Sequence, residues 1–218
     1  MSLERMDDFF NSRVDVYEEH MLSNVAGANK FYVKTAEQLP NKTKLNILDL
    51  GCGTGLEINE IFKLHPHARI SGVDLATDML DKLLSKFQHK LSQLNPIEGD
   101  FFVLDFGTNI FDAAISVQSM HHYHPIDKIK IYKKIYHSLK DEGVYIETDY
   151  TAPNQEFEDF NFSKYSKLKK KLKLHNGHYH FDTPCTVENQ IKILKQAGFN
   201  SVDLVYKIAA TVIIVAKK

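Results

Sequence analysis

The chain has few cysteines, no tryptophan and no excess of either charge. Its 218 residues include two cysteines, Cys52 and Cys185, and 27 basic against 28 acidic side chains, for a net charge of −1. Two cysteines cannot build a disulfide framework, and so few are consistent with a reducing compartment. The balanced charge gives no overall field that attracts a polyanion, so nucleic acid is not a favoured partner.

No apolar run in the sequence is long enough to cross a membrane. The longest, residues 208–216, is about half of the roughly 20 residues that a spanning helix needs, and it is typical of a strand. Residues 1–8 lack the apolar core of a signal peptide. We therefore expect a cytoplasmic protein that does not contact a membrane.

Strand-like and helix-like segments alternate along the chain, which predicts an α/β fold with a mainly parallel sheet and helices on both faces. With 43% hydrophobic residues, the chain can form one domain over residues 1–218. Residues 207–209 are too few for a crossover helix, so the last two strands must pair antiparallel as a hairpin. The expected strands are 46–50, 69–74, 96–99, 111–117, 143–149, 201–206 and 210–216, and the expected helices are 56–65, 77–92, 126–139 and 187–197.

A glycine-rich loop between an apolar strand and a helix predicts a nucleotide-like ligand. The segment Ile47-Leu-Asp-Leu-Gly-Cys-Gly-Thr-Gly55 leads into a helical pattern that places Ile58, Ile61 and Phe62 on one face. The three glycines permit a tight turn and close approach of the main chain to a ligand. Free N–H groups at the start of the following helix point at the same place.

Two more acidic residues end the next two strand-like runs. Asp74 stands 19 residues after Gly55, where a carboxylate can bind ribose hydroxyls, and Asp100 follows the third run. A lone aspartate at a strand end more often caps a turn or helix. Three aspartates after three successive strand-like runs, Asp49 included, favour a ligand site.

The glycine spacing, the acidic strand ends and the closing hairpin resemble the class I S-adenosylmethionine-dependent methyltransferases, in particular their small-molecule branch with a Rossmann-like sheet of seven strands. The resemblance covers residues 45–150 and 186–218. It implies S-adenosylmethionine as the cofactor, with the glycines and Gln118 at the methionine part, Asp49 near the amino group, Asp74 on the ribose, and Leu75, Met79, Asp100 and the Phe101 main chain at the adenine. For Met79, packing in the core is an equally good interpretation.

Two segments outside this core are expected to shape the substrate site. Residues 1–44 look helical in pieces and resemble the amino-terminal cap of related enzymes, where Arg13 and Tyr17 would close over the cofactor. Packing of Tyr17 on the sheet explains that residue nearly as well. Residues 151–185 form an insert that would act as a lid, and residues 186–218 supply the last helix and hairpin.

The lid contains six lysines between Lys164 and Lys173. Tyr165, Leu168 and Leu172 form one stripe of this helix, so the lysines fit a solvated face without any partner. Attraction of an acidic substrate or RNA to this patch stays open.

Histidines concentrate after the fourth strand, in His121-His122-Tyr123-His124, at the edge where ligands of open α/β sheets bind. A neutral imidazole can accept the proton that a methyl acceptor loses, which makes His121 or His122 a candidate base. A packing or hydrogen-bonding role is at least as well supported. Tyr123 and Tyr150 are candidates to line the acceptor pocket.

A metal site is the competing interpretation of the histidines. His178 and His180 would face the same way on a strand, but no acidic or cysteine partner at a recognisable spacing completes a site. We therefore predict no metal.

The predicted function is transfer of a methyl group from S-adenosylmethionine to O, N or C of a small molecule. Another enzyme that modifies S-adenosylmethionine would share the binding residues, and so would a non-catalytic subunit that binds it. A nicotinamide-dependent oxidoreductase is disfavoured by the glycine spacing and the hairpin. The acceptor cannot be identified from the residues, and a homodimer stays open.

Overall fold

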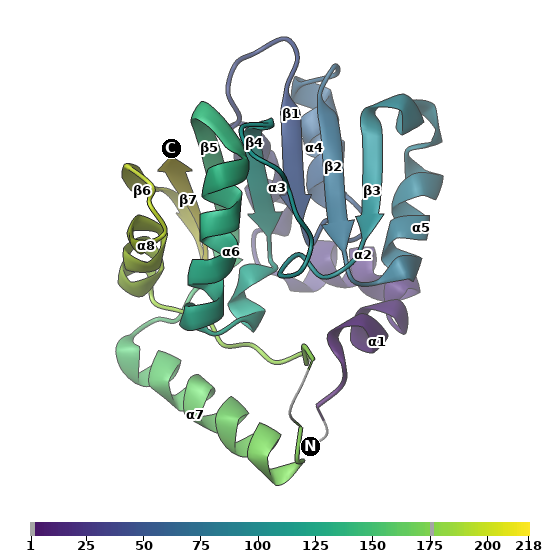
Figure 1. The fold of residues 1–218 in the computed structure, drawn as a ribbon. Coiled ribbons are helices and arrows are strands. Elements are labelled where there is room, and N and C mark those ends of the chain that lie inside the picture. Colours follow the sequence, from purple (N-terminus) through teal and green to yellow (C-terminus); the bar gives the residue numbers. More distant parts are fainter. Residues whose placement is uncertain (1–2, 175–176) are drawn as a thin grey trace.

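In the computed structural model, a seven-stranded sheet forms the centre of the protein (Figure 1). The structure describes residues 3–174 and 177–218. The strand order is β3-β2-β1-β4-β5-β7-β6, and β7 is antiparallel to both of its neighbours while the other pairs are parallel. The predicted sheet class and closing hairpin are thereby confirmed. The strands are β1 (Asn46–Leu50), β2 (Arg69–Asp74), β3 (Leu94–Glu98), β4 (Phe111–Val117), β5 (Leu139–Tyr150), β6 (Ser201–Ile208) and β7 (Thr211–Lys217).

Helices cover both faces of the sheet because successive strand residues point to opposite sides. Ile47 of β1 packs in the apolar cluster of one face, while Leu48 and Leu50 pack in that of the other. The first face carries α3 (Ala28–Ala36), α4 (Leu56–Leu64) and α5 (Thr77–Lys86), and the second carries α6 (Pro125–Ser138) and α8 (Val187–Gln196).

Several predicted boundaries need correction. The helix expected over 77–92 ends at Lys86 and continues as a 3₁₀ helix, η1 (Gln88–Gln93), because Phe87 leaves helical geometry to pack beside Phe62. Leu91, which lies on η1 rather than on a continued α-helix, is half exposed. Strand β5 begins at Leu139, directly after α6, rather than at residue 143.

The ends of two other helices agree with their capping residues. Pro125 occupies the first turn of α6, and the side chain of Thr186 accepts a hydrogen bond from Asn189 N–H at the start of α8. Gly198 follows α8 with a positive φ, as expected of a stop residue. These local signals set where α6 and α8 begin and where α8 ends.

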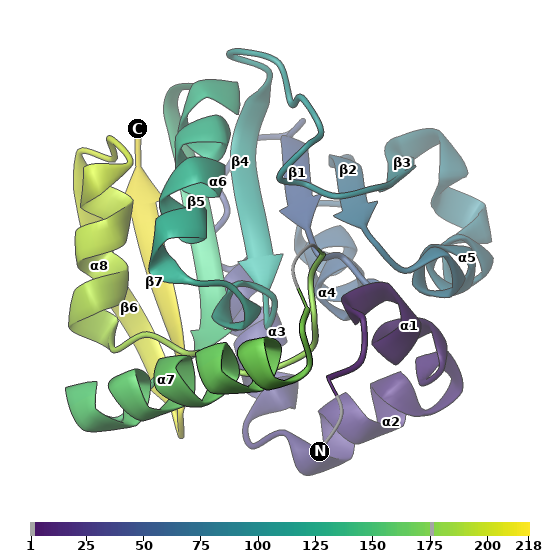
Figure 2. The same cartoon turned by 60° about the horizontal axis from the view of Figure 1, so that its bottom comes forward.

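The amino-terminal helices and the insert lie beyond the carboxyl ends of the parallel strands (Figure 2). They are α1 (Met6–Asn11), α2 (Val14–Asn24) and α7 (Gln155–Lys171). An isolated antiparallel bridge joins Arg5 to Tyr179, with Met6 N–H donating to the His178 carbonyl at 2.9 Å. The amino-terminal segment and the insert are therefore connected to each other over this edge of the sheet.

The lysine-rich helix α7 extends along the outside of the molecule (Figure 2). Tyr165 stacks on Phe181 of the same insert, with ring centroids 5.3 Å apart, while Leu172 at the helix end is exposed. In the described part of the chain, no helix combines the length and the apolar character that a membrane span requires.

Candidate active site

The glycine loop between β1 and α4 uses its three glycines for different purposes. All three have a positive φ, which favours glycine. A Cβ on Gly51 would lie 2.3 Å from Ser119 Oγ, and one on Gly55 would lie 2.4 Å from Leu83 Cδ1. A Cβ on Gly53 would meet nothing closer than Tyr17, at 3.8 Å. Gly51 and Gly55 are therefore required by packing, whereas Gly53 leaves space for a ligand beside the main chain.

A pocket lies against this loop at the carboxyl ends of β1 and β2, with about 500 Å³ of space that is partly open to solvent. Most of the predicted cofactor residues line it, together with Met6, Phe10 and Ser119, which the sequence did not single out. The predicted residues in its wall are Tyr17, Gly51, Gly53, Asp74, Leu75, Met79, Phe101, Gln118, His122 and Tyr123.

Three predicted cofactor residues do not line this pocket. Gly55 instead precedes the first residue of α4, and Asp49 is fully buried. Asp100 accepts a hydrogen bond from Phe102 N–H at 2.8 Å, and its other oxygen lies 3.0 Å from His178 Nε2. The carboxylate of Asp100 is thus engaged by the insert, and a contact with adenine stays a prediction.

Asp74 connects the glycine loop to the end of β2. Its Oδ2 accepts a hydrogen bond from Gly53 N–H at 2.8 Å, and its Oδ1 accepts one from Ala76 N–H at 2.9 Å. Burial raises the pKa of Asp74, and these two main-chain donors oppose that shift. The carboxylate is held in one orientation at the pocket wall.

Asp49 and Glu57 form a buried pair of carboxyl groups below the loop. Both oxygens of Asp49 and Oε1 of Glu57 are buried without a hydrogen-bond partner among the described residues. Burial, and next the charge of Glu57, raises the pKa of Asp49, and burial raises the pKa of Glu57 to about 7. Buried carboxyl oxygens without hydrogen bonds are costly, so this pair is a feature of the site that a ligand at the loop would affect.

A second and larger pocket adjoins the first, with about 1560 Å³ of space that is partly open to solvent. Four residues line both pockets, namely Phe10, Tyr17, Gln118 and His122. Tyr150 and His121, both predicted site residues, line the second pocket only. A ligand in the first pocket and a ligand in the second would therefore meet beside these four shared residues.

Gln118 is held in an unusual backbone conformation at this junction. Its φ is +51°, which is uncommon for a residue other than glycine. Its N–H donates to the Thr148 carbonyl at 2.8 Å, and its Nε2 donates to Thr211 Oγ1 at 3.0 Å. Such strain is often kept where the chain must direct a side chain at a ligand.

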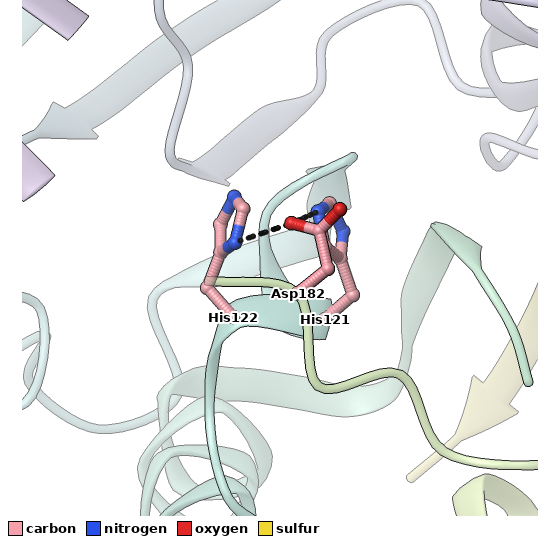
Figure 3. A group of neighbouring side chains, drawn as sticks. All are labelled: His121, His122 and Asp182. Atoms are coloured by element: carbon pink, nitrogen blue, oxygen red, sulfur yellow. Dashed lines mark ion pairs between the residues drawn. The ribbon is translucent and has the colours of Figure 1, made fainter. Parts of the chain in front are cut away.

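The two predicted base candidates, His121 and His122, lie on η2 (Met120–His122). They form a cluster with two carboxylates from other parts of the chain, Asp149 and Asp182. His121 Nδ1 lies 2.5 Å from Asp149 Oδ1, and His121 Nε2 lies 3.5 Å from Asp182 Oδ1. His122 Nδ1 lies 3.4 Å from the same Asp182 oxygen (Figure 3). Asp182 belongs to the insert, so the tertiary structure assembles the cluster from distant parts of the chain.

Burial acts against protonation of both histidines, but their neighbours differ. The carboxylates of Asp149 and Asp182 outweigh burial at His121 and raise its pKa to about 9. At His122, burial and the adjacent His121 lower the pKa. The two histidines are therefore electrostatically unequal despite being neighbours in sequence.

Sequence reasoning missed both carboxylates of this cluster. Asp149 could have been found, because it ends a buried strand at the same edge as Asp49 and Asp74. Asp182 carries no comparable signal in an irregular segment. The histidine pair of the insert does not form a shared site: His178 faces Asp100, while His180 stacks on Phe9 with ring centroids 3.5 Å apart.

Comparison with known proteins agrees with this architecture. Residues 47–143 match the sequence profile of a family described as a methyltransferase domain. A carboxy-S-adenosyl-L-methionine synthase of Nautilia profundicola is 25% identical over 215 residues, which is 92% of this chain and 85% of that protein. A phosphoethanolamine N-methyltransferase of Plasmodium falciparum is 29% identical over 162 residues, covering 72% of this chain and 54% of that protein.

Among solved structures, phosphoethanolamine N-methyltransferase 2 of Haemonchus contortus in complex with S-adenosyl-L-methionine superposes with a TM-score of 0.70 at 22% identity. The match covers 91% of this chain and 45% of that one, so this chain spans about half the length of both N-methyltransferases. The matched profile covers residues 47–143, and the fold agrees with that of the S-adenosylmethionine-dependent methyltransferases. The chain contains a class I methyltransferase domain, and the cofactor of this class is S-adenosylmethionine.

Proposed function

We propose that this protein transfers a methyl group from S-adenosylmethionine to a small molecule bound in the second pocket. The observation that carries the proposal is the junction of two pockets, one against the glycine loop and one under the amino-terminal helices, through four shared residues. Methyl transfer requires two ligands whose reacting atoms meet in line, and adjoining pockets meet that requirement.

The cofactor pocket suits each part of S-adenosylmethionine. The open face of Gly53 and the strained Gln118 would hold the methionine part, and Asp74 would accept hydrogen bonds from the ribose hydroxyls. Leu75, Met79 and Phe101 offer an apolar surface for the adenine ring. The unsatisfied carboxyl oxygens of Asp49 would favour the positively charged amino group nearby.

When bound, S-adenosylmethionine supplies a methyl group that its sulfonium already activates, so the protein needs little acid-base chemistry. The role of the chain is to orient the acceptor and to exclude water. Phe10 and Tyr17 from the cap would cover the junction, and His122 and Tyr150 would orient the acceptor. The bridge between Arg5 and Tyr179 would hold cap and insert together over the bound ligands.

The proposal is tested first by calorimetric titration of the full chain with S-adenosylmethionine and with the demethylated cofactor. The protein is then incubated with methyl-labelled cofactor and a panel of small hydroxyl and amine compounds, and products are identified by mass. We expect saturable binding of both cofactors and label in an acceptor. Absence of binding would contradict the proposal.

A second function is favoured by one comparison. The Nautilia profundicola relative, which aligns over 92% of this chain, is named a carboxy-S-adenosyl-L-methionine synthase. If this chain instead carboxylated the cofactor, a mixture that also contains small carboxylic acids as carboxyl donors would yield S-adenosylmethionine with the mass of a carboxyl group added and its labelled carbon retained. Label in a separate acceptor would exclude that function for the reaction observed.

A further inference from the structure

His121, His122 and Asp182 converge on one point in the wall of the second pocket. The two histidines lie on η2, directly after β4, and Asp182 enters from the insert between them (Figure 3). One ligand atom from each residue lies within 4.8 Å of the other two. No other group of three such side chains with this spacing occurs among the residues that the structure describes.

Two of the three separations in this cluster match those between the ligands of one metal ion, and the third lies within 4.8 Å. Atoms bound tetrahedrally to zinc at about 2.0–2.2 Å are separated from each other by about 3.4 Å. Asp182 Oδ1 lies 3.5 Å from His121 Nε2 and 3.4 Å from His122 Nδ1. These separations are longer than a good hydrogen bond, and a bound ion would account for them.

His121 already has the support that a ligating histidine usually has. Its Nδ1 lies 2.5 Å from Asp149 Oδ1, which leaves Nε2 directed at Asp182. A carboxylate on the far ring nitrogen fixes the tautomer and orientation of a metal-binding imidazole. Asp149 is itself oriented by a hydrogen bond from Tyr150 N–H at 2.8 Å.

Asp182 is also fixed beside the histidines. The next residue, Thr183, donates from its N–H and its hydroxyl to the His121 carbonyl, at 2.8 and 3.1 Å. The insert is therefore bonded to the same short helix that carries both imidazoles, and Asp182 stays between them even though its side chain is half exposed.

His122 provides a further observation. Its side chain is 6% exposed, and its Nδ1 makes no hydrogen bond in the described structure, although Asp182 Oδ1 lies 3.4 Å away as an ion-pair partner. Buried polar atoms in native proteins are nearly always hydrogen-bonded, so a buried nitrogen held only by this longer contact calls for an explanation. A bound cation would satisfy it.

We propose that His121, His122 and Asp182 bind one divalent transition metal ion, of which zinc is the best fit to two imidazoles and a carboxylate. Three protein ligands leave a coordination position open toward the second pocket, as in catalytic rather than structural zinc sites. The next step rests on the proposed function. In that case the ion would bind a methyl acceptor at its open position, and the acceptor would carry a ligating oxygen of a hydroxyl, carboxylate or phosphate group.

The test uses the full chain after dialysis against a chelator. Zn²⁺ is titrated in by calorimetry, and Co²⁺ is added separately to record its visible absorption bands, with Mg²⁺ as a control cation. We expect one Zn²⁺ per chain and Co²⁺ bands of a nitrogen- and oxygen-ligated site. His122→Gln and Asp182→Asn should each weaken Zn²⁺ binding at least 10-fold, and Asp149→Asn about 10- to 100-fold.

His20→Gln is the matched control, because His20 lines the same pocket outside the cluster. This variant should keep wild-type Zn²⁺ affinity, and circular dichroism verifies that all variants are folded. The proposal is overturned if the folded wild-type chain binds no stoichiometric Zn²⁺ or Co²⁺, or if binding survives both His122→Gln and Asp182→Asn. A hydrogen-bonded cluster without metal would be the conclusion in that case.

Titration of the same samples with S-adenosylmethionine separates this proposal from the proposed function. Cofactor binding without Zn²⁺ binding overturns the metal site alone. Zn²⁺ binding without cofactor binding overturns the proposed function and leaves the metal site standing.

Discussion

The main-chain N–H of Gly53 donates to Oδ2 of Asp74 at 2.8 Å, so the glycine loop after β1 is bonded directly to the acidic end of β2. Two residues 21 positions apart in sequence thereby form part of one wall of the first pocket. The carboxylate that would bind ribose also holds the loop that would bind methionine. Changes at either residue are expected to affect cofactor binding before they affect the fold.

Asp74→Asn should weaken binding of the demethylated cofactor by about 10- to 100-fold, since a hydrogen bond to a charged group contributes about 1.5–3 kcal/mol. Calorimetry measures the change. Asp81→Asn, on the exposed side of α5, is the matched control and should bind as wild type. Equal affinities for wild type, Asp74→Asn and Asp81→Asn would show that Asp74 does not contribute to cofactor binding.

Gly53→Ala should mainly weaken cofactor binding, whereas Gly55→Ala should mainly destabilise the fold. A Cβ at residue 53 meets only Tyr17 at 3.8 Å, so its stability cost is the left-handed backbone, about 1–2 kcal/mol, while the cofactor loses its approach to the loop. A Cβ at residue 55 would lie 2.4 Å from Leu83, which adds an overpacking cost of about 1–3 kcal/mol. Urea unfolding and cofactor titration of both variants measure the two effects, and a larger loss of stability in Gly53→Ala would contradict this assignment.

Stability of the cofactor-free protein should fall as the pH rises from about 4.5 to about 7. Burial raises the pKa of Glu57 to about 7 from its ordinary 4.5, so in this window the folded state keeps a proton that the unfolded state has lost. The free energy of unfolding therefore decreases with pH, by up to about 3 kcal/mol from this group. Asp49, whose pKa is also raised, acts in the same direction.

Glu57→Gln removes that titration and isolates the effect. Urea unfolding at pH 4 and pH 8 should show the variant gaining stability relative to wild type at the higher pH. The low-pH measurement is the internal control, because Glu57 is protonated in both states there. A difference between variant and wild type that is the same at both pH values would show that Glu57 ionises normally.

Ala210→Trp should separate the acceptor from the cofactor. Ala210 is exposed in the hairpin turn and lines the second pocket but not the first. The larger side chain should raise KM for the acceptor about 10-fold or more while cofactor affinity changes less than about twofold. Leu204→Trp, exposed on β6 of the same hairpin, is the control. Unchanged kinetics in Ala210→Trp would place the acceptor elsewhere.

The sequence predicted most of the residues that line the first pocket, because the signals for them are local. The three glycines follow β1 and Asp74 ends β2, and parallel strands end at one edge of the sheet. The errors occurred where packing outweighed periodicity, as at Phe87, which ends α5 by packing beside Phe62. On α6 the fully buried residues are Ile131, Tyr132 and Ile135, while Ile129 and Tyr136 are only partly buried at the margin of this face.

The sequence by itself determined the α/β sheet, its closing hairpin and the meeting of the glycine loop with Asp74 at one sheet edge, because periodicity, glycine geometry and strand polarity are properties of short segments. Only the tertiary structure decided that Asp182 lies between His121 and His122, 60 residues away along the chain from His122, and that Phe10 and Tyr17 stand at the junction of two pockets. Loop placement depends on long-range contacts such as that of Thr183 with the His121 carbonyl, and no local pattern encodes these.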